Sequence, residues 1–76
     1  MDKQEIINRL EQVLDKPFDL EVQGEGCSFS LSIVCDSFEG LSLVKRQQLV
    51  YRAFNDDIAS GAVHALSLVT KTSAES

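Results

Sequence analysis

The sequence predicts a two-layer α+β domain of order α-β-β-α-α-β, with a three-stranded mixed sheet and the helices on one face. Three observations support this fold class. Apolar residues recur at helical spacing in two parts of the chain, residues 18–23 and 27–35 alternate between apolar and polar, and a helical segment connects the second strand to the third. With 76 residues, a single domain spanning 1–76 is expected.

The first helix is expected to begin after Asp2 and to end before Pro17, about three turns later. Asp2 and Glu5 have the spacing of a capping box, in which side chains bind the free N–H groups of the first turn. Proline cannot continue a helix, because it lacks the backbone N–H that the helix requires. The apolar residues that share one face of this helix are Ile6, Ile7, Leu10, Val13 and Leu14.

Two strands should follow as an antiparallel hairpin with one buried and one solvated face. The apolar face carries Phe18, Leu20 and Val22 in the first strand and Phe29, Leu31, Ile33 and Cys35 in the second. The segment GEG at 24–26 supplies the turn, because glycine readily adopts positive φ. Cys35 is therefore expected to be a buried thiol, and Cys27, beside the turn, a partly exposed one.

The second half of the chain predicts two helices and a strand. Ser42 is a candidate N-cap for a helix from about Leu43 to Phe54, and NDD at 55–57 is expected to break it. A short helix then ends at Gly61, and a third strand runs from Val63 to Val69. Such a crossover favours a parallel return beside the second strand. The polar tail from about residue 71 is expected to be frayed.

The charge is uneven along the chain. The net charge is −5, which disfavours binding to nucleic acid or to an anionic membrane. Residues 1–41 carry nine acids and three bases, whereas residues 42–76 carry three acids and four bases. Lys45, Arg46 and Arg52 form the only basic cluster. This cluster is either a solvated helix face or a weak candidate for nucleic-acid contacts.

No signal peptide and no apolar stretch of about 20 residues is visible, so we expect a cytoplasmic protein with no membrane association.

If the third strand lies parallel to the second, Cys27 and His64 approach each other at the edge where both strands begin. Two such ligands cannot complete a metal site, so any metal would need a second molecule.

His64 also has a simpler interpretation. Taken alone, the sequence pattern favours a hydrogen-bonded strand residue that shares a face with Leu66 and Leu68. As a nucleophile and base, Cys27 and His64 would lack an orienting third group and an oxyanion hole. We therefore expect that the chain is not an enzyme.

Two segments resemble the BolA family: FEGLSLVKRQQLVY at 38–51, with its Phe-x-Gly turn, and VHALSLVTKT at 63–72, with a histidine followed by alanine. The resemblance covers essentially the whole chain, although the tryptophan-containing segment that follows the last strand in many members is absent here. It implies a fold similar to the type II KH fold. The family also includes members described as transcriptional regulators, in which a segment matching 42–60 is likened to a helix-turn-helix.

The resemblance further implies a partner and a cofactor. BolA proteins pair with monothiol glutaredoxins of the CGFS type, and the heterodimer shares a [2Fe-2S] cluster held by glutaredoxin cysteine, glutathione and BolA ligands. His64 matches one of these ligands and Cys27 is the candidate for the other. The isolated chain is expected to bind no cluster and to be a monomer or a weak homo-oligomer. The alternatives are DNA binding through Lys45, Arg46 and Arg52, and a structural adaptor without a cluster.

Overall fold

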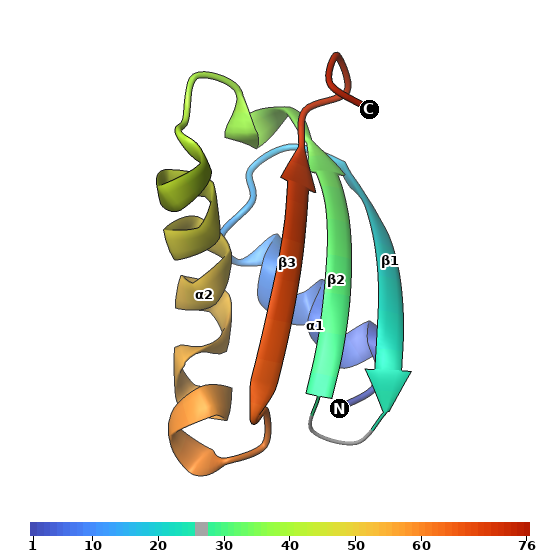
Figure 1. Ribbon diagram of the computed structural model, residues 1–76, viewed down its shortest axis with the longest axis vertical. Helices are drawn as coiled ribbons and strands as arrows, with labels where there is room; N and C mark the ends of the chain where they lie inside the picture. Colours follow the sequence, from blue (N-terminus) through green and yellow to red (C-terminus); the bar gives the residue numbers. More distant parts are fainter. Residues whose placement is uncertain (26–27) are drawn as a thin grey trace.

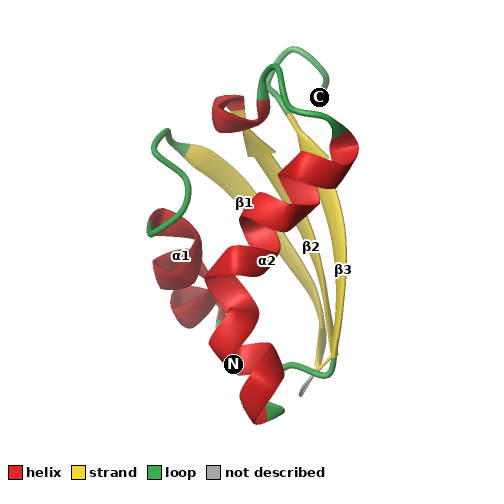
Figure 2. Cartoon of the chain, turned by 90° about the vertical axis from the view of Figure 1, so that its left-hand side faces the viewer, coloured by secondary structure: helices red, strands yellow, loops and turns green. Residues whose placement is uncertain are grey.

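The computed structural model describes residues 1–25 and 28–76 (Figure 1). Its elements are α1 (Lys3–Glu11), β1 (Phe18–Glu25), β2 (Ser28–Cys35), the short 3-10 helix η1 (Asp36–Phe38), α2 (Leu43–Ser60) and β3 (Ala65–Lys71). Both α-helices lie on the same side of the sheet (Figure 2). The predicted two-layer α+β fold with a three-stranded sheet is confirmed.

The sheet has the order β1-β2-β3 and is mixed. β1 runs antiparallel to β2, with Phe18 opposite Cys35. β3 runs parallel to β2, with Ala65 opposite Ser28. The parallel return predicted from the helical crossover is thus confirmed, and β2 and β3 begin at the same end of the sheet (Figure 1).

The core lies between the central strand and the two helices. β2 follows the predicted alternation, and its four core-facing side chains are buried: Phe29, Leu31, Ile33 and Cys35. From the helices, the buried apolar side chains include Ile6 and Leu10 of α1 and Val50 and Phe54 of α2. Burial of these groups is the main favourable contribution to folding in so small a domain.

The first helix begins as predicted but ends earlier. The Asp2 carboxylate accepts a hydrogen bond from the Glu5 N–H at 2.8 Å, which satisfies one free donor of the first turn. α1 ends at Glu11, and the chain then makes one further turn in which the N–H groups of Val13 and Leu14 donate to Leu10 O. Leu14 remains buried, so the apolar face extends past the regular helix.

The predicted break at 55–57 is wrong, because α2 continues without interruption from Leu43 to Ser60. Asp57 lies on the buried face of α2, one turn after Phe54, and is 9% exposed. Its carboxylate accepts hydrogen bonds from Arg9 Nε at 3.0 Å and from Arg9 Nη2 at 3.4 Å. This pairing with α1 satisfies the buried charge, so the acidic segment can remain helical.

The C-terminal residues are not frayed, contrary to the prediction. Thr72 is buried, and the residues after it form a turn that contacts two other elements. Ser73 donates from its N–H to Asp36 of η1 at 2.9 Å. Glu75 pairs with Arg46 of α2 at 2.6 Å and accepts a bond from Thr72 N–H at 2.8 Å. These polar contacts fix the tail although it has few apolar residues.

The Glu75 contacts predict an acid-sensitive contribution to stability. The hydrogen bond from Arg46 lowers the pKa of Glu75 from 4.5 to about 2. A pKa that is lower in the folded state stabilises the fold above about pH 4.5, and the contribution is lost as pH falls towards 2. The difference in free energy of unfolding between wild type and Glu75→Gln should therefore shrink over this range. Urea unfolding at pH 6, 4 and about 2 measures it.

A matched control is Glu39→Gln, which removes an exposed carboxylate next to η1 without removing a contact of the C-terminal turn. If both variants show the same dependence on pH, the Arg46–Glu75 pair is not its source.

Candidate functional site

The candidate site is the end of the sheet where β2 and β3 both begin. Ala65 opens β3 and pairs with Ser28, the first residue of β2. His64 directly precedes Ala65 and is exposed. The prediction that His64 lies at this edge is confirmed, although β3 begins at Ala65 and not at Val63.

The turn before β3 has a fixed geometry. Gly61 ends α2 in the left-handed conformation, with φ of 82°, and its N–H donates to Ile58 O. The N–H of Val63 then donates to Asp57 O at 3.1 Å, and the Val63 side chain is 2% exposed. Because Val63 anchors the chain in the core, the next residue is directed outward.

The simpler interpretation of His64 as a hydrogen-bonded strand residue is not what the structure shows. No described residue forms a hydrogen bond with the imidazole, and a Cβ placed on Gly61 would lie 3.5 Å from Nε2. The ring therefore lies beside the turn that ends α2, at the surface. An exposed imidazole can act as a ligand or as a proton acceptor.

The structure describes only one of the two cysteines. Cys27 precedes Ser28 in the sequence but lies outside the described residues. Cys35 is buried, as predicted: its sulfur accepts from Ser37 N–H at 3.4 Å and lies 3.6 Å from Lys16 O. Across residues 1–25 and 28–76, no three side chains are grouped to hold a metal ion. Within this part of the chain, His64 is the predicted ligand, and it is exposed at the end of the sheet where β2 and β3 begin.

The basic cluster is not a set of three equivalent side chains. Arg46 is 13% exposed at its side chain and donates to Leu41 O at 3.0 Å as well as to Glu75. Lys45 and Arg52 are exposed on α2. The segment 42–60 contains one continuous helix, so the likeness to a helix-turn-helix is wrong. DNA binding through these residues stays a prediction.

Two ion pairs between distant parts of the chain were not predicted from the sequence. Arg9 and Asp57 join the two helices, and Arg46 and Glu75 hold the C-terminal turn. Asp57 carried a weak signal, since it continues the helical spacing of Val50 and Phe54 along one face. The sequence around Arg46 gave no signal of its pairing, because its partner lies 29 residues away.

The chain is a small α+β domain in which two helices cover one face of a three-stranded mixed sheet. Its candidate ligating side chain, an exposed histidine, lies directly before the parallel edge strand. Residues 4–75 match the family described as BolA-like protein. The chain belongs to the BolA-like family.

Individual relatives support this placement. The chain is 55% identical over 47 residues to SufE-like protein 1, chloroplastic/mitochondrial, from Arabidopsis thaliana, a match that covers 62% of this chain and only 12% of that protein. It is 37% identical over 71 residues to the acid stress protein IbaG of Escherichia coli K12, covering 90% of this chain and 84% of that protein.

A solved structure agrees with the fold. BolA1 from Arabidopsis thaliana aligns with a TM-score of 0.82 at 32% identity, over 96% of this chain and 93% of that one. Neither helix of the described chain has the length and apolar character that crossing a bilayer requires.

Proposed function

We propose that the chain binds a [2Fe-2S] cluster jointly with a monothiol CGFS glutaredoxin, in cluster trafficking or in the regulation of iron homeostasis. The observation that carries the proposal is His64, an exposed imidazole at the end of the sheet where β2 and β3 begin. Histidine nitrogen is an established ligand of [2Fe-2S] clusters.

The single histidine suits a cluster that is shared between two proteins. Four protein or thiol ligands hold a [2Fe-2S] cluster, so one imidazole leaves most of the coordination to other groups. By family resemblance, the glutaredoxin supplies a cysteine and positions glutathione. Cys27 is the proposed second ligand of this chain, because it adjoins Ser28, the pairing partner of Ala65. The cluster supplies its own redox chemistry, and His64 supplies a neutral nitrogen ligand.

The orientation of His64 also fits this role. Val63 is fixed in the core and Gly61 closes the helix, so the backbone on the N-terminal side of His64 is held in place. A ligand on a held backbone loses little conformational entropy when the partner arrives. Exposure leaves room for a second protein to approach the ring.

The experiment is anaerobic reconstitution of the chain with a CGFS glutaredoxin and glutathione. We expect a coloured heterodimer from wild type, whose visible absorption and circular dichroism change in His64→Ala because one iron loses its nitrogen ligand. In His64→Cys the cluster should be retained with a lower reduction potential, because thiolate replaces neutral imidazole. The chain alone should stay colourless.

The matched control is Ala62→Ser, an exposed change in the same turn that leaves the imidazole in place. It should reproduce the wild-type spectrum. An unchanged spectrum in His64→Ala would show that His64 is not a ligand. Cys27→Ala, measured in parallel, tests the second ligand separately from the first.

A further inference from the structure

The two helices cover the sheet unevenly. The core-facing side chains of the central strand are buried, whereas those of β1 are only half-buried: Phe18, Leu20 and Val22. These three residues pack against the hydrophobic core at its open margin. Apolar surface at the edge of a sheet is therefore left in contact with water beside α1.

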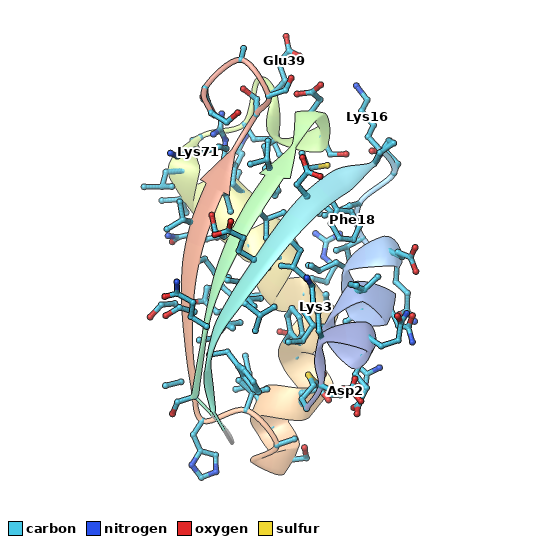
Figure 3. All side chains as sticks on the ribbon, turned by 90° about the vertical axis from the view of Figure 1, so that its right-hand side faces the viewer. Asp2, Lys3, Lys16, Phe18, Glu39 and Lys71 are labelled. Carbon is cyan, nitrogen blue, oxygen red and sulfur yellow. The ribbon has the colours of Figure 1, made fainter. Side chains whose placement is uncertain are left out.

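A groove follows this margin, between α1 and β1. It has a volume of about 670 Å³, and its apolar lining includes Ile7, Leu14, Phe18 and Leu20. Its charged lining is mixed: Lys3, Glu11, Asp15, Lys16 and Asp19. In Figure 3, the labelled Lys16, Phe18 and Lys3 follow one another down this side of the molecule. The volume is in the range of ordinary binding clefts.

The two edges of the sheet differ in their backbone partners. On β3, the carbonyl of Leu66 accepts from Tyr51 Oη at 3.1 Å and the carbonyl of Thr70 from Arg46 Nη1 at 3.5 Å. In the described part of the chain, no side chain bonds to the backbone of β1, whose only pairing partner is β2. An edge strand in this state presents unpaired N–H and C=O groups to another chain.

The charges on β1 select the kind of chain that can pair there. Asp19 and Glu21 alternate with Phe18 and Leu20 and are exposed on the outer face of the sheet. A second copy of this chain, paired antiparallel along β1, would place its own Asp19 and Glu21 on the same face of the sheet as those of the first copy. Like charges that face each other destabilise strand pairing. A strand with basic residues on that face would be attracted.

We propose that the β1 edge and the α1–β1 groove bind an extended segment of a partner protein with alternating apolar and basic residues. The segment adds a fourth strand beside β1, places its apolar side chains over Ile7, Phe18 and Leu20, and places its basic side chains beside Asp19 and Glu21. Phe18, which lines the groove, pairs with the last residue of β2 and so lies at the opposite end of the sheet from His64.

The test uses a capped peptide of four alternating lysine–valine pairs, titrated into the isotopically labelled chain and followed by NMR. Amide shifts and slowed hydrogen exchange should map to β1 and α1. A glutamate–valine peptide of the same length should bind about tenfold more weakly, because its cross-strand pairs are repulsive. In the double variant Asp19→Lys, Glu21→Lys this preference should reverse.

Both substituted positions are exposed, so the variant should keep the fold. The proposal is overturned if neither peptide binds, if the shifts map to α2 or β3, or if the double variant keeps the wild-type preference. Self-association of the wild type through β1 would assign the edge to a second copy of the chain and would overturn it as well.

Discussion

Phe54→Ala should remove a large share of the stability of the domain at 25 °C. Phe54 lies on the buried face of α2 and is 1% exposed. Truncating a fully buried phenylalanine costs about 3–5 kcal/mol, through lost burial and the cavity that remains. A chain of this length has a total stability of roughly 4–11 kcal/mol. Urea unfolding followed by far-ultraviolet circular dichroism should show a midpoint at a much lower urea concentration than in wild type.

The matched control is Phe18→Ala, which makes the same chemical change at the open margin of the sheet. Phe18 is only half-buried, so its truncation returns less apolar surface to water and leaves no closed cavity. Its cost should be less than half that of Phe54→Ala. Equal losses in the two variants would mean that the core is not concentrated between the central strand and α2.

The position of Phe54 also explains how far the fold could be predicted. The alternation of apolar and polar residues in β2 is a local pattern with the period of a strand. The rule that a helical crossover returns to a parallel strand follows from the twist of the backbone. Both depend on the sequence within one element or on its connection to the next. The burial of Phe29 and Leu31 and the parallel pairing of β3 with β2 were therefore predictable.

The errors have a different physical origin. The segment NDD favours a helix end when taken alone, but Asp57 is stabilised in the helix by Arg9, which lies 48 residues away. The polar tail looks frayed, but Asp36 and Arg46 provide its hydrogen bonds. Tertiary context of this kind overrides local propensity, and a local pattern cannot identify the partner because the partner lies far away in the sequence.

The candidate site was predictable in part for the same reason. The place of His64 follows from strand order, which the crossover rule supplies. Its exposure follows from the capping geometry at Gly61 and the anchoring of Val63, which the apolar pattern around it hides. The open groove beside β1 could not be predicted, because it depends on how α1 lies across the sheet.

Gly24→Ala should be strongly destabilising. Gly24 has φ of 109°, a conformation that L side chains rarely adopt. A Cβ at this position would also overlap the carbonyl oxygen of Ser28 and lie 3.2 Å from Phe29 Cα. Backbone strain of this kind costs about 1–3 kcal/mol, and overpacking adds about 1–3 kcal/mol. The midpoint of thermal unfolding should fall by more than about 10 °C.

Gly40→Ala separates the two causes. Gly40 also has positive φ, at 79°, but a Cβ there would have no atom within 4 Å. Its cost should be limited to the conformational term of about 1–2 kcal/mol. If Gly24→Ala and Gly40→Ala are equally destabilised, the hairpin shifts to relieve the overlap with Ser28. If Gly24→Ala loses clearly more, the close approach of β1 and β2 is rigid, and glycine is required at position 24 for space as well as for conformation.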